Sequence, residues 1–319
     1  MNAFCTQNFP PNNRFHGAEG FSRSGSGCSI KNRIHGHSLS GALILGLALL
    51  PGHPGYALAE DARASDPNLS NPTSVVVANR DGHTIAGLVT HLQDVKSFKH
   101  GVALFPGSPG IMKLQVEDGR EKFSLSGNFL VRSRRHWLDA ETLVVVVDAP
   151  SDQWATFYQH FRETPRYGAD VAALLKEVER LYPVGDWTFV GTSEGSVSAY
   201  HAARMNPSLA RRTILTSSLF SPGKNGPGLS GINWKETPKD LLWVHHEDDP
   251  CSYTSYRDAK RYSQKSGKPL LTVRGGGPGR GPSCEAYSSH GYAGIERETV
   301  LAMRSWIKTG VVPADVNPK

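Results

Sequence analysis

Short runs of apolar residues without alternating polar positions recur along the chain. Such runs, rich in Val, Leu and Ile, are typical of strands covered on both faces. Several are separated by segments with helical periodicity, and alternating strands and helices require parallel pairing with right-handed crossovers. The pattern therefore predicts an α/β fold with a mostly parallel sheet and helices on both faces. The predicted strands are 101–105, 143–147, 188–190, 213–216, 241–245 and 270–273, and the predicted helices are 129–138, 168–182, 196–205, 256–266 and 295–308.

Two further apolar runs, 74–79 and 84–91, precede these strands. The pair Asp81-Gly82 between them is a hairpin signal, so they are expected to pair antiparallel at an edge of the sheet. The total is about eight strands. The Gly- and Pro-rich segments 221–231 and 275–282 are expected to be surface loops.

The first 59 residues have the pattern of an export signal. Lys31 and Arg33 precede an uncharged apolar run over 39–50, and the small-x-small triplet that ends at Ala59 follows. Twelve apolar residues are too few to span a bilayer, but they suit a secretory signal with cleavage near Ala59. The alternative is a buried N-terminal helix. The chain is thus divided into a signal peptide with an upstream extension (1–59), a linker (60–73) and one domain (74–319), and it is expected to be periplasmic or secreted.

The composition of the chain after residue 59 argues against nucleic acid and a membrane as partners. The 59 leading residues contain four of the 35 Lys and Arg and one of the 29 Asp and Glu, which leaves a formal net charge of +3. No basic cluster with interleaved aromatic residues indicates nucleic acid, and no second long apolar run indicates a membrane span. Two cysteines, Cys251 and Cys284, remain after residue 59. In an exported protein they are candidates for one disulfide.

Residues 187–200, WTFVGTSEGSVSAY, contain the strongest chemical motif. An apolar strand runs into a G-x-S-x-G turn and then into small residues that suit a helix. Gly191 and Gly195 leave room for a strained turn that presents Ser193 as a nucleophile, where side chains would collide with neighbouring elements. The first backbone N–H groups of the helix point toward the serine and would stabilise a developing oxyanion.

The loop 105–110, FPGSPG, directly follows a predicted strand. In an acyl-transfer site of this design, one oxyanion donor is the N–H after the nucleophile, here Glu194, and the second comes from this loop, with Ser108 the preferred donor. The glycine-rich stretch 275–281 could be mistaken for a phosphate cradle. It lacks the Gly-Lys-Ser/Thr ending and a following helix, so it is interpreted as a loop.

The segment 241–251, LLWVHHEDDPC, contains several possible metal ligands at the end of a strand. His245 and His246 are adjacent on the strand and point to opposite faces, which disfavours one shared ion. No metal site and no cofactor are therefore predicted. We expect an aspartate of this turn to orient a histidine, with Asp249 preferred and Asp248 as the alternative.

His290 lies in a loop, SSHG, just before a final amphipathic helix. The order Ser193, Asp249, His290 is the nucleophile, acid and base order of one known architecture. This order favours His290 as a general base over a surface histidine.

These pieces resemble the α/β-hydrolase fold superfamily. The matching segments are FPGSPG, VVVVDAP, VGTSEGS, VHHEDDPC and SHGYAGIE, and the last two are similar to a group of exported bacterial serine hydrolases. The resemblance implies a catalytic triad of Ser193, Asp249 and His290. One departure is His246, where many members have Gly. A bond between Cys251 and Cys284 would tie the loop of the predicted acid to the loop of the predicted base.

The predicted function is that of a serine hydrolase that forms an acyl-enzyme, acting on small-molecule carboxylic esters. Amide or peptide hydrolysis, acyl transfer and non-catalytic binding on the same scaffold are the alternatives. Only 217–239 separates the strands that would flank a lid, so no large lid is expected. Four aromatic residues after the strand 143–147 could line an acyl pocket or serve as packing: Trp154, Phe157, Tyr158 and Phe161.

Overall fold

The computed structural model describes residues 73–234 and 237–316. The predicted signal peptide and the linker up to residue 72 lie outside the described residues. The strands are β1 (Thr73–Arg80), β2 (His83–Thr90), β3 (Phe98–Phe105), β4 (Gln115–Glu117), β5 (Arg120–Lys122), β6 (Thr142–Val147), β7 (Val184–Thr192), β8 (Ala210–Thr216), β9 (Leu241–His246) and β10 (Leu270–Val273). The helices are α1 (Phe129–Arg132), α2 (Gln159–Arg162), α3 (Pro165–Leu181), α4 (Gly195–Met205), α5 (Tyr256–Ser266) and α6 (Glu296–Thr309), with 3₁₀ turns η3 (Arg134–Trp137), η4 (Ser151–Gln153) and η6 (Ser289–Gly291).

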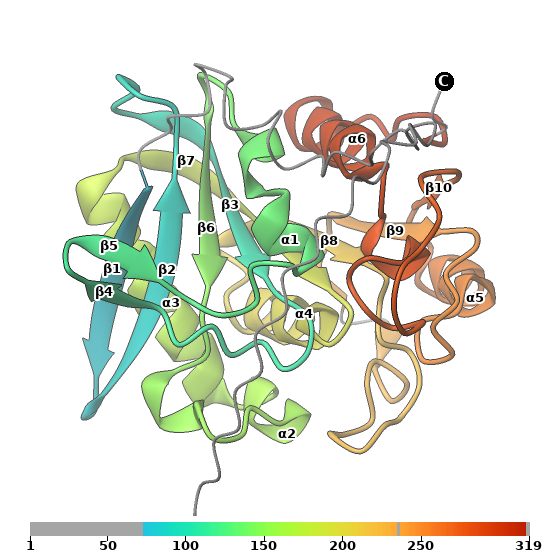
Figure 1. Cartoon of the computed structure of the whole chain (residues 1–319), viewed down its shortest axis with the longest axis horizontal. Helices are drawn as coiled ribbons and strands as arrows, with labels where there is room; N and C mark the ends of the chain where they lie inside the picture. The colour runs from blue at the N-terminus through green and yellow to red at the C-terminus, as the bar shows by residue number, and fades with distance from the viewer. Residues whose placement is uncertain (1–72, 235–236, 317–319) are drawn as a thin grey trace, which may run out of the picture. The chain divides into compact units, whose positions relative to one another are not determined.

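Eight strands form the main sheet in the order β1-β2-β6-β3-β7-β8-β9-β10 (Figure 1). β1 pairs antiparallel with β2, and β2 pairs antiparallel with β6. The remaining neighbours are parallel. At the predicted hairpin, Asp81 and Gly82 both have positive φ, 44° and 84°, as a two-residue turn between twisted strands requires. The predicted eight-stranded, mostly parallel sheet is confirmed.

Two hydrophobic cores, one on each face of the sheet, explain the continuous apolar runs. In β3, Ala103 and Phe105 belong to one core, whereas Val102 and Leu104 belong to the other. Residues of α3, α4 and α5 complete the first core, and residues of α1 and α6 complete the second (Figure 1). Because successive side chains of a strand point to opposite faces, a strand covered on both sides needs apolar residues at every position.

Local capping signals set the start of α3 and both ends of α5. Thr164 accepts a hydrogen bond from the backbone N–H of Tyr167 at the start of α3, where Pro165 occupies the first helical position. α5 begins after Ser255, whose hydroxyl accepts from the N–H of Asp258, and it ends at Gly267 with φ of 64°. These helices extend close to the limits that their sequence patterns predict.

The helix predicted over 129–138 is wrong as one element. The chain forms the short helix α1 and then the 3₁₀ turn η3, separated by Ser133. The Ser133 hydroxyl and N–H both hydrogen-bond to the carbonyl of Phe129, at 2.6 and 3.0 Å. A serine that bonds the local backbone in this way competes with helix continuation.

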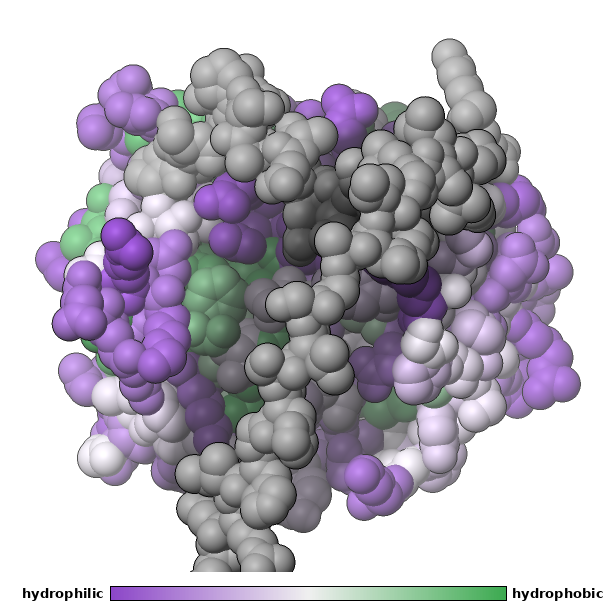
Figure 2. Space-filling view, viewed as in Figure 1, coloured by the Kyte–Doolittle hydropathy of each residue, from purple (hydrophilic) through white to green (hydrophobic). Residues whose placement is uncertain are grey.

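A second difference is the small hairpin of β4 and β5, which was not predicted. Its turn is Asp118-Gly119, with φ of 51° and 74°, so the same two-residue signal was present in the sequence. Its strands have three residues each and are exposed, and Figure 2 shows hydrophilic side chains over this hairpin.

The connection between β8 and β9 contains no α-helix within its described residues, 217–234 and 237–240, which agrees with the prediction of no large lid. No helix in the part of the chain that the structure describes has the length and apolar character needed to cross a membrane.

Candidate active site

The turn between β7 and α4 has the strained geometry that its glycines predict. Ser193 has φ of 52°, in the left-handed region that a residue with a side chain rarely adopts. A Cβ at Gly191 would lie 2.2 Å from the carbonyl oxygen of Gly195, and a Cβ at Gly195 would lie 2.1 Å from that of Phe105. Glycine at both positions therefore lets the turn pass between its own helix and the end of strand β3.

Backbone hydrogen bonds hold this conformation on both sides of the serine. The Ser193 N–H donates to the carbonyl oxygens of Thr216 and Ser217, each at 3.1 Å. The Ser193 carbonyl accepts from the N–H and the hydroxyl of Ser196, at 2.9 and 2.6 Å. A left-handed residue costs about 1–3 kcal/mol, and these contacts offset that strain.

Asp249 and His290 come together from loops 41 residues apart in sequence. His290 Nδ1 lies 3.0 Å from Asp249 Oδ2, and the two side chains are 5% and 0% exposed. A carboxylate oxygen accepts hydrogen bonds, so Nδ1 donates its proton to Asp249 and Nε2 is the ring nitrogen left for another partner. The alternative acid, Asp248, is exposed and its backbone N–H bonds to the ring of His246. The structure therefore brings Asp249, and not Asp248, to the histidine.

Thr254 is a member of this cluster that the sequence analysis missed. Its hydroxyl donates to Asp249 Oδ2 at 2.8 Å and lies 3.1 Å from His290 Nδ1. The other carboxylate oxygen, Oδ1, accepts from the backbone N–H of Cys251 at 2.9 Å. Three donors thus orient one carboxylate.

The loop of His290 is fixed by contacts to the sheet. The Ser288 hydroxyl accepts from the His290 N–H at 3.1 Å, and the Ser217 hydroxyl donates to the His290 carbonyl at 2.7 Å. Tyr292, whose φ is 58°, donates its hydroxyl to the carbonyl of Val244 at 2.8 Å. Burial raises the pKa of Tyr292, so the hydroxyl remains a donor at neutral pH. These contacts tie the loop of His290 to the end of β8 and to β9.

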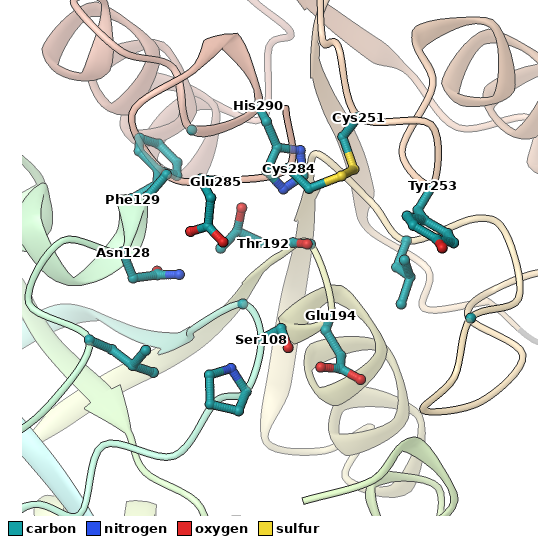
Figure 3. Close-up of a pocket in the computed structure, with 18 of the residues that line it drawn as sticks. Ser108, Asn128, Phe129, Thr192, Glu194, Cys251, Tyr253, Cys284, Glu285 and His290 are labelled. Atoms are coloured by element: carbon teal, nitrogen blue, oxygen red, sulfur yellow. A yellow bond between two sulfur atoms is a disulfide. The ribbon is translucent and has the colours of Figure 1, made fainter. Parts of the chain in front are cut away.

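The predicted disulfide between Cys251 and Cys284 is present, with Cα atoms 4.6 Å apart. It joins the turn of Asp249 to the loop that leads to His290, and both cysteines line the same pocket as the histidine (Figure 3). Cys251 is buried, whereas Cys284 is exposed.

Ser193 and His290 line one pocket of about 700 Å³ together with Ser108 and Glu194 (Figure 3). Within the described residues no hydrogen bond joins Ser193 Oγ to His290. Such contacts commonly tighten only when substrate binds. The backbone N–H groups of Ser108 and Glu194 likewise donate to no other group in the residues that the structure describes. A Cβ at Gly107 would lie 3.2 Å from the Cβ of Ser193, so the loop of Ser108 passes directly beside the serine.

The four aromatic residues considered for an acyl pocket do not line it. Phe157 and Phe161 are buried in the core that includes α3, and Trp154 packs against that core. The apolar part of the pocket comes instead from segments distant in sequence, namely the start of α1 and several loops, through Leu125, Phe129, Leu219, Tyr253 and Tyr287. The packing alternative is therefore correct for Trp154, Phe157 and Phe161, whereas Tyr158 is exposed and serves neither purpose.

His245 and His246 have separate partners. His245 Nε2 accepts from the N–H of Ser218 at 2.7 Å, and burial lowers the pKa of His245 to about 3, so it is neutral. His246 Nε2 lies 2.8 Å from the carbonyl of Gly275 on another loop. In the part of the chain that is described, no group of three or more His, Cys, Asp or Glu side chains could hold a metal ion.

Comparisons with known proteins concern the fold. No protein-family model and no curated protein matches the chain. Among solved structures, Est1E from Butyrivibrio proteoclasticus is similar with a TM-score of 0.50 and 11% identity, over 73% of this chain and 97% of that one. A serine hydrolase without lid from Xanthomonas campestris has a TM-score of 0.47 and 13% identity, over 79% and 100%. A cold-adapted esterase from an Arctic intertidal metagenomic library has a TM-score of 0.46 and 16% identity, over 66% and 87%. Of these three, Est1E reaches a TM-score of 0.50, and at such identity it establishes the fold alone.

Proposed function

We propose that this chain, which has the α/β-hydrolase fold, is a serine hydrolase that acts on carboxylic esters through an acyl-enzyme. The observation that carries the proposal is the hydrogen bond of 3.0 Å between Asp249 and His290, at a pocket that Ser193 also lines. A strained serine, an imidazole oriented through its Nδ1, and two backbone N–H groups without a hydrogen-bond partner among the described residues are the parts that acyl transfer requires.

In the proposed mechanism, His290 Nε2 takes the proton of the Ser193 hydroxyl as Oγ attacks the carbonyl carbon of the ester. The N–H groups of Glu194 and Ser108 hold the oxyanion of the tetrahedral intermediate. His290 then gives its proton to the departing alcohol, which leaves an acyl group on Ser193. Water attacks this ester with His290 again as base, and the free acid leaves. Asp249 stabilises the imidazolium in both steps.

The open pocket supports hydrolysis over acyl transfer. Three of the residues that line it, Lys224, Tyr253 and Tyr287, are exposed side chains of loops, and the described residues of 217–240 contain no α-helix that could form a lid. Water therefore has access to an acyl group on Ser193. An acyltransferase would need to exclude water or to hold an acceptor alcohol or amine in its place.

We also propose that the chain is exported and cleaved near Ala59. The disulfide supports this proposal, because disulfides persist mainly in oxidising compartments. N-terminal sequencing of protein from a periplasmic or extracellular fraction would test it. A protein that retains residues before Ala59 and remains in the cytoplasm would contradict it.

The first test is labelling of the oxidised protein with a fluorophosphonate, followed by a panel of short-chain esters. We expect labelling that disappears in Ser193→Ala and falls strongly in His290→Ala. Ser230→Ala, which changes an exposed serine bonded to the carbonyl of Pro227, is the matched control and keeps full labelling. A well-folded wild-type protein that neither labels nor cleaves any ester would refute the proposal and favour a binding protein on this scaffold.

A further inference from the structure

Arg162, the last residue of α2, carries a guanidinium group that is fully buried behind the pocket. It makes four hydrogen bonds. Nη1 donates to the Ser198 hydroxyl at 2.6 Å, and Nη2 donates to the carbonyl of Pro109 at 2.9 Å. Nε and Nη2 both donate to the carbonyl of Phe157, at 3.2 and 2.9 Å. Burial of a charged group is costly unless it is paired and hydrogen-bonded, so a hydrogen bond from each of the three guanidinium nitrogens indicates a specific arrangement.

The charge of Arg162 faces the carboxylate of Glu194. Nη2 lies 3.8 Å from Glu194 Oε2, and Glu194 Oε1 accepts from the side chain of Gln159 at 3.3 Å. Glu194 Oε2 is buried and has no hydrogen-bond partner among the described residues. The attraction to Arg162 is therefore the interaction that compensates this oxygen. Glu194, whose backbone N–H is the first proposed oxyanion donor, is thus held in place through its side chain.

Arg162 also holds the second proposed donor. Pro109, whose carbonyl accepts from Nη2, directly follows Ser108. The next residue, Gly110, has φ of 73°, and a Cβ there would lie 3.2 Å from Arg162 Nη1, so the loop is packed against the guanidinium. Ser198, the partner of Nη1, lies four residues after Glu194, one turn into α4.

One rigid, planar group therefore connects the two backbone segments whose N–H groups would bind the oxyanion. Its fork of donors has fixed geometry, unlike the flexible ammonium of lysine. Arg162 does not line the pocket, so it can affect the reaction only through the groups that it positions. Donors in an oxyanion hole act through their placement relative to the transition state, and small displacements are costly there.

We infer that Arg162 is a positioning residue of the oxyanion hole, which sets the spacing between the N–H groups of Ser108 and Glu194 through the Pro109 carbonyl, the Ser198 hydroxyl and the Glu194 carboxylate. This inference rests on the proposed function, because it assumes that these two N–H groups bind an oxyanion. Misplacement of the donors lowers kcat and leaves KM nearly unchanged, because the contact is strongest in the transition state.

The test compares Arg162→Met and Arg162→Lys with the wild type on an ester and on its thiono analogue, in which sulfur replaces the carbonyl oxygen. Sulfur is a poor hydrogen-bond acceptor, so a well-aligned oxyanion hole favours the oxygen ester strongly. We expect kcat for the ester to fall about 10²–10³-fold in Arg162→Met. The ratio of the ester rate to the thionoester rate is expected to fall together with kcat. In Arg162→Lys, kcat and this ratio are expected to recover in part.

Arg166→Met is the matched control. Arg166 lies four residues further along the chain, is 38% exposed and pairs with Asp152 at 2.5 Å, away from the pocket. Its removal leaves the rate ratio unchanged. If Arg162→Met does not fold, Ser198→Ala removes one partner of the guanidinium at smaller structural cost, and a smaller fall in the same ratio is expected.

An unchanged ratio in the folded Arg162 and Ser198 variants overturns the inference and leaves the proposed function intact. A loss of thermal stability at normal kcat and normal ratio does the same, because it indicates a purely structural role. A wild-type protein that shows neither labelling nor ester cleavage overturns the inference and the proposed function together.

Discussion

Removal of the disulfide between Cys251 and Cys284 is expected to lower stability far more than activity. The bond closes a loop with a sequence separation of 33 residues. In the chain-entropy model, such a cross-link removes about 12.5 cal/mol/K from the unfolded ensemble, which is about 3.7 kcal/mol at 25 °C. For a domain of this size, 1 kcal/mol corresponds to about 2–4 °C in Tm, so the expected decrease is about 7–15 °C.

Activity depends on the relative placement of Asp249 and His290, and hydrogen bonds hold these two residues together even without the disulfide. Asp249 and His290 are joined by their own hydrogen bond, and Thr254 contacts both. The folded protein without the bond should therefore keep kcat within about tenfold of the oxidised form at 25 °C, since a lost hydrogen bond of about 1 kcal/mol corresponds to less than tenfold.

The assay is thermal unfolding followed by circular dichroism, with kcat measured well below Tm. Oxidised wild type, reduced wild type and the Cys251→Ala/Cys284→Ala variant are compared. Reduced wild type keeps the buried sulfur of Cys251, so any further loss in the double variant measures the cavity that Ala leaves. Equal Tm values for the oxidised and reduced protein would refute the reasoning. Loss of activity at full stability would refute it as well.

Three further predictions concern the acid, the turn and a buried histidine. Asp249→Asn is expected to lower kcat by about 10³–10⁴-fold because the amide favours the wrong tautomer of His290, while Asp248→Asn leaves kcat unchanged. Gly195→Ala is expected to abolish fluorophosphonate labelling or folding, because its Cβ would lie 2.1 Å from a backbone carbonyl oxygen. The pKa of His245, lowered to about 3 by burial, means that the unfolded chain binds one more proton between pH 6.5 and 3. The free energy of unfolding therefore falls as pH decreases through that window, and urea titrations of His245→Gln should show a shallower decrease.

Each of these predictions has an outcome that contradicts it. Equal losses of kcat in the Asp249 and Asp248 variants would mean that the acid is not selected by the contact with His290. A Gly195→Ala protein that folds and labels normally would show that the turn can relax away from β3. An identical pH dependence in His245→Gln would assign the acid sensitivity to other groups.

Local sequence was sufficient to predict the sheet and the serine turn. Continuous apolar runs specify strands buried on both faces, and Gly191 and Gly195 are required by contacts within a few residues of the turn or with the adjacent strand. The convergence of Ser193, Asp249 and His290 could also be predicted from the sequence. Each residue follows a predicted strand, and the carboxyl ends of parallel strands meet at one edge of the sheet. Ser133 shows the limit of local patterns, since one side-chain hydrogen bond divided a predicted helix.

The groups around the predicted triad depend on contacts between distant segments. Thr254 could be assigned to this cluster only once its hydroxyl was found beside both Asp249 and His290. The residues that line the pocket come from several separate segments between Gly107 and Gly291.

The sequence by itself determined the strands of the main sheet, the hairpin turn at Asp81-Gly82, the serine motif and the two cysteines, because periodicity, backbone sterics and residue chemistry act over a few neighbouring positions. Tertiary structure alone placed Asp249, and not Asp248, against His290, excluded the aromatic residues near 157 from the pocket and placed Arg162 between Pro109 and Glu194. These outcomes depend on where side chains from separate elements converge after packing. No local pattern encodes that convergence.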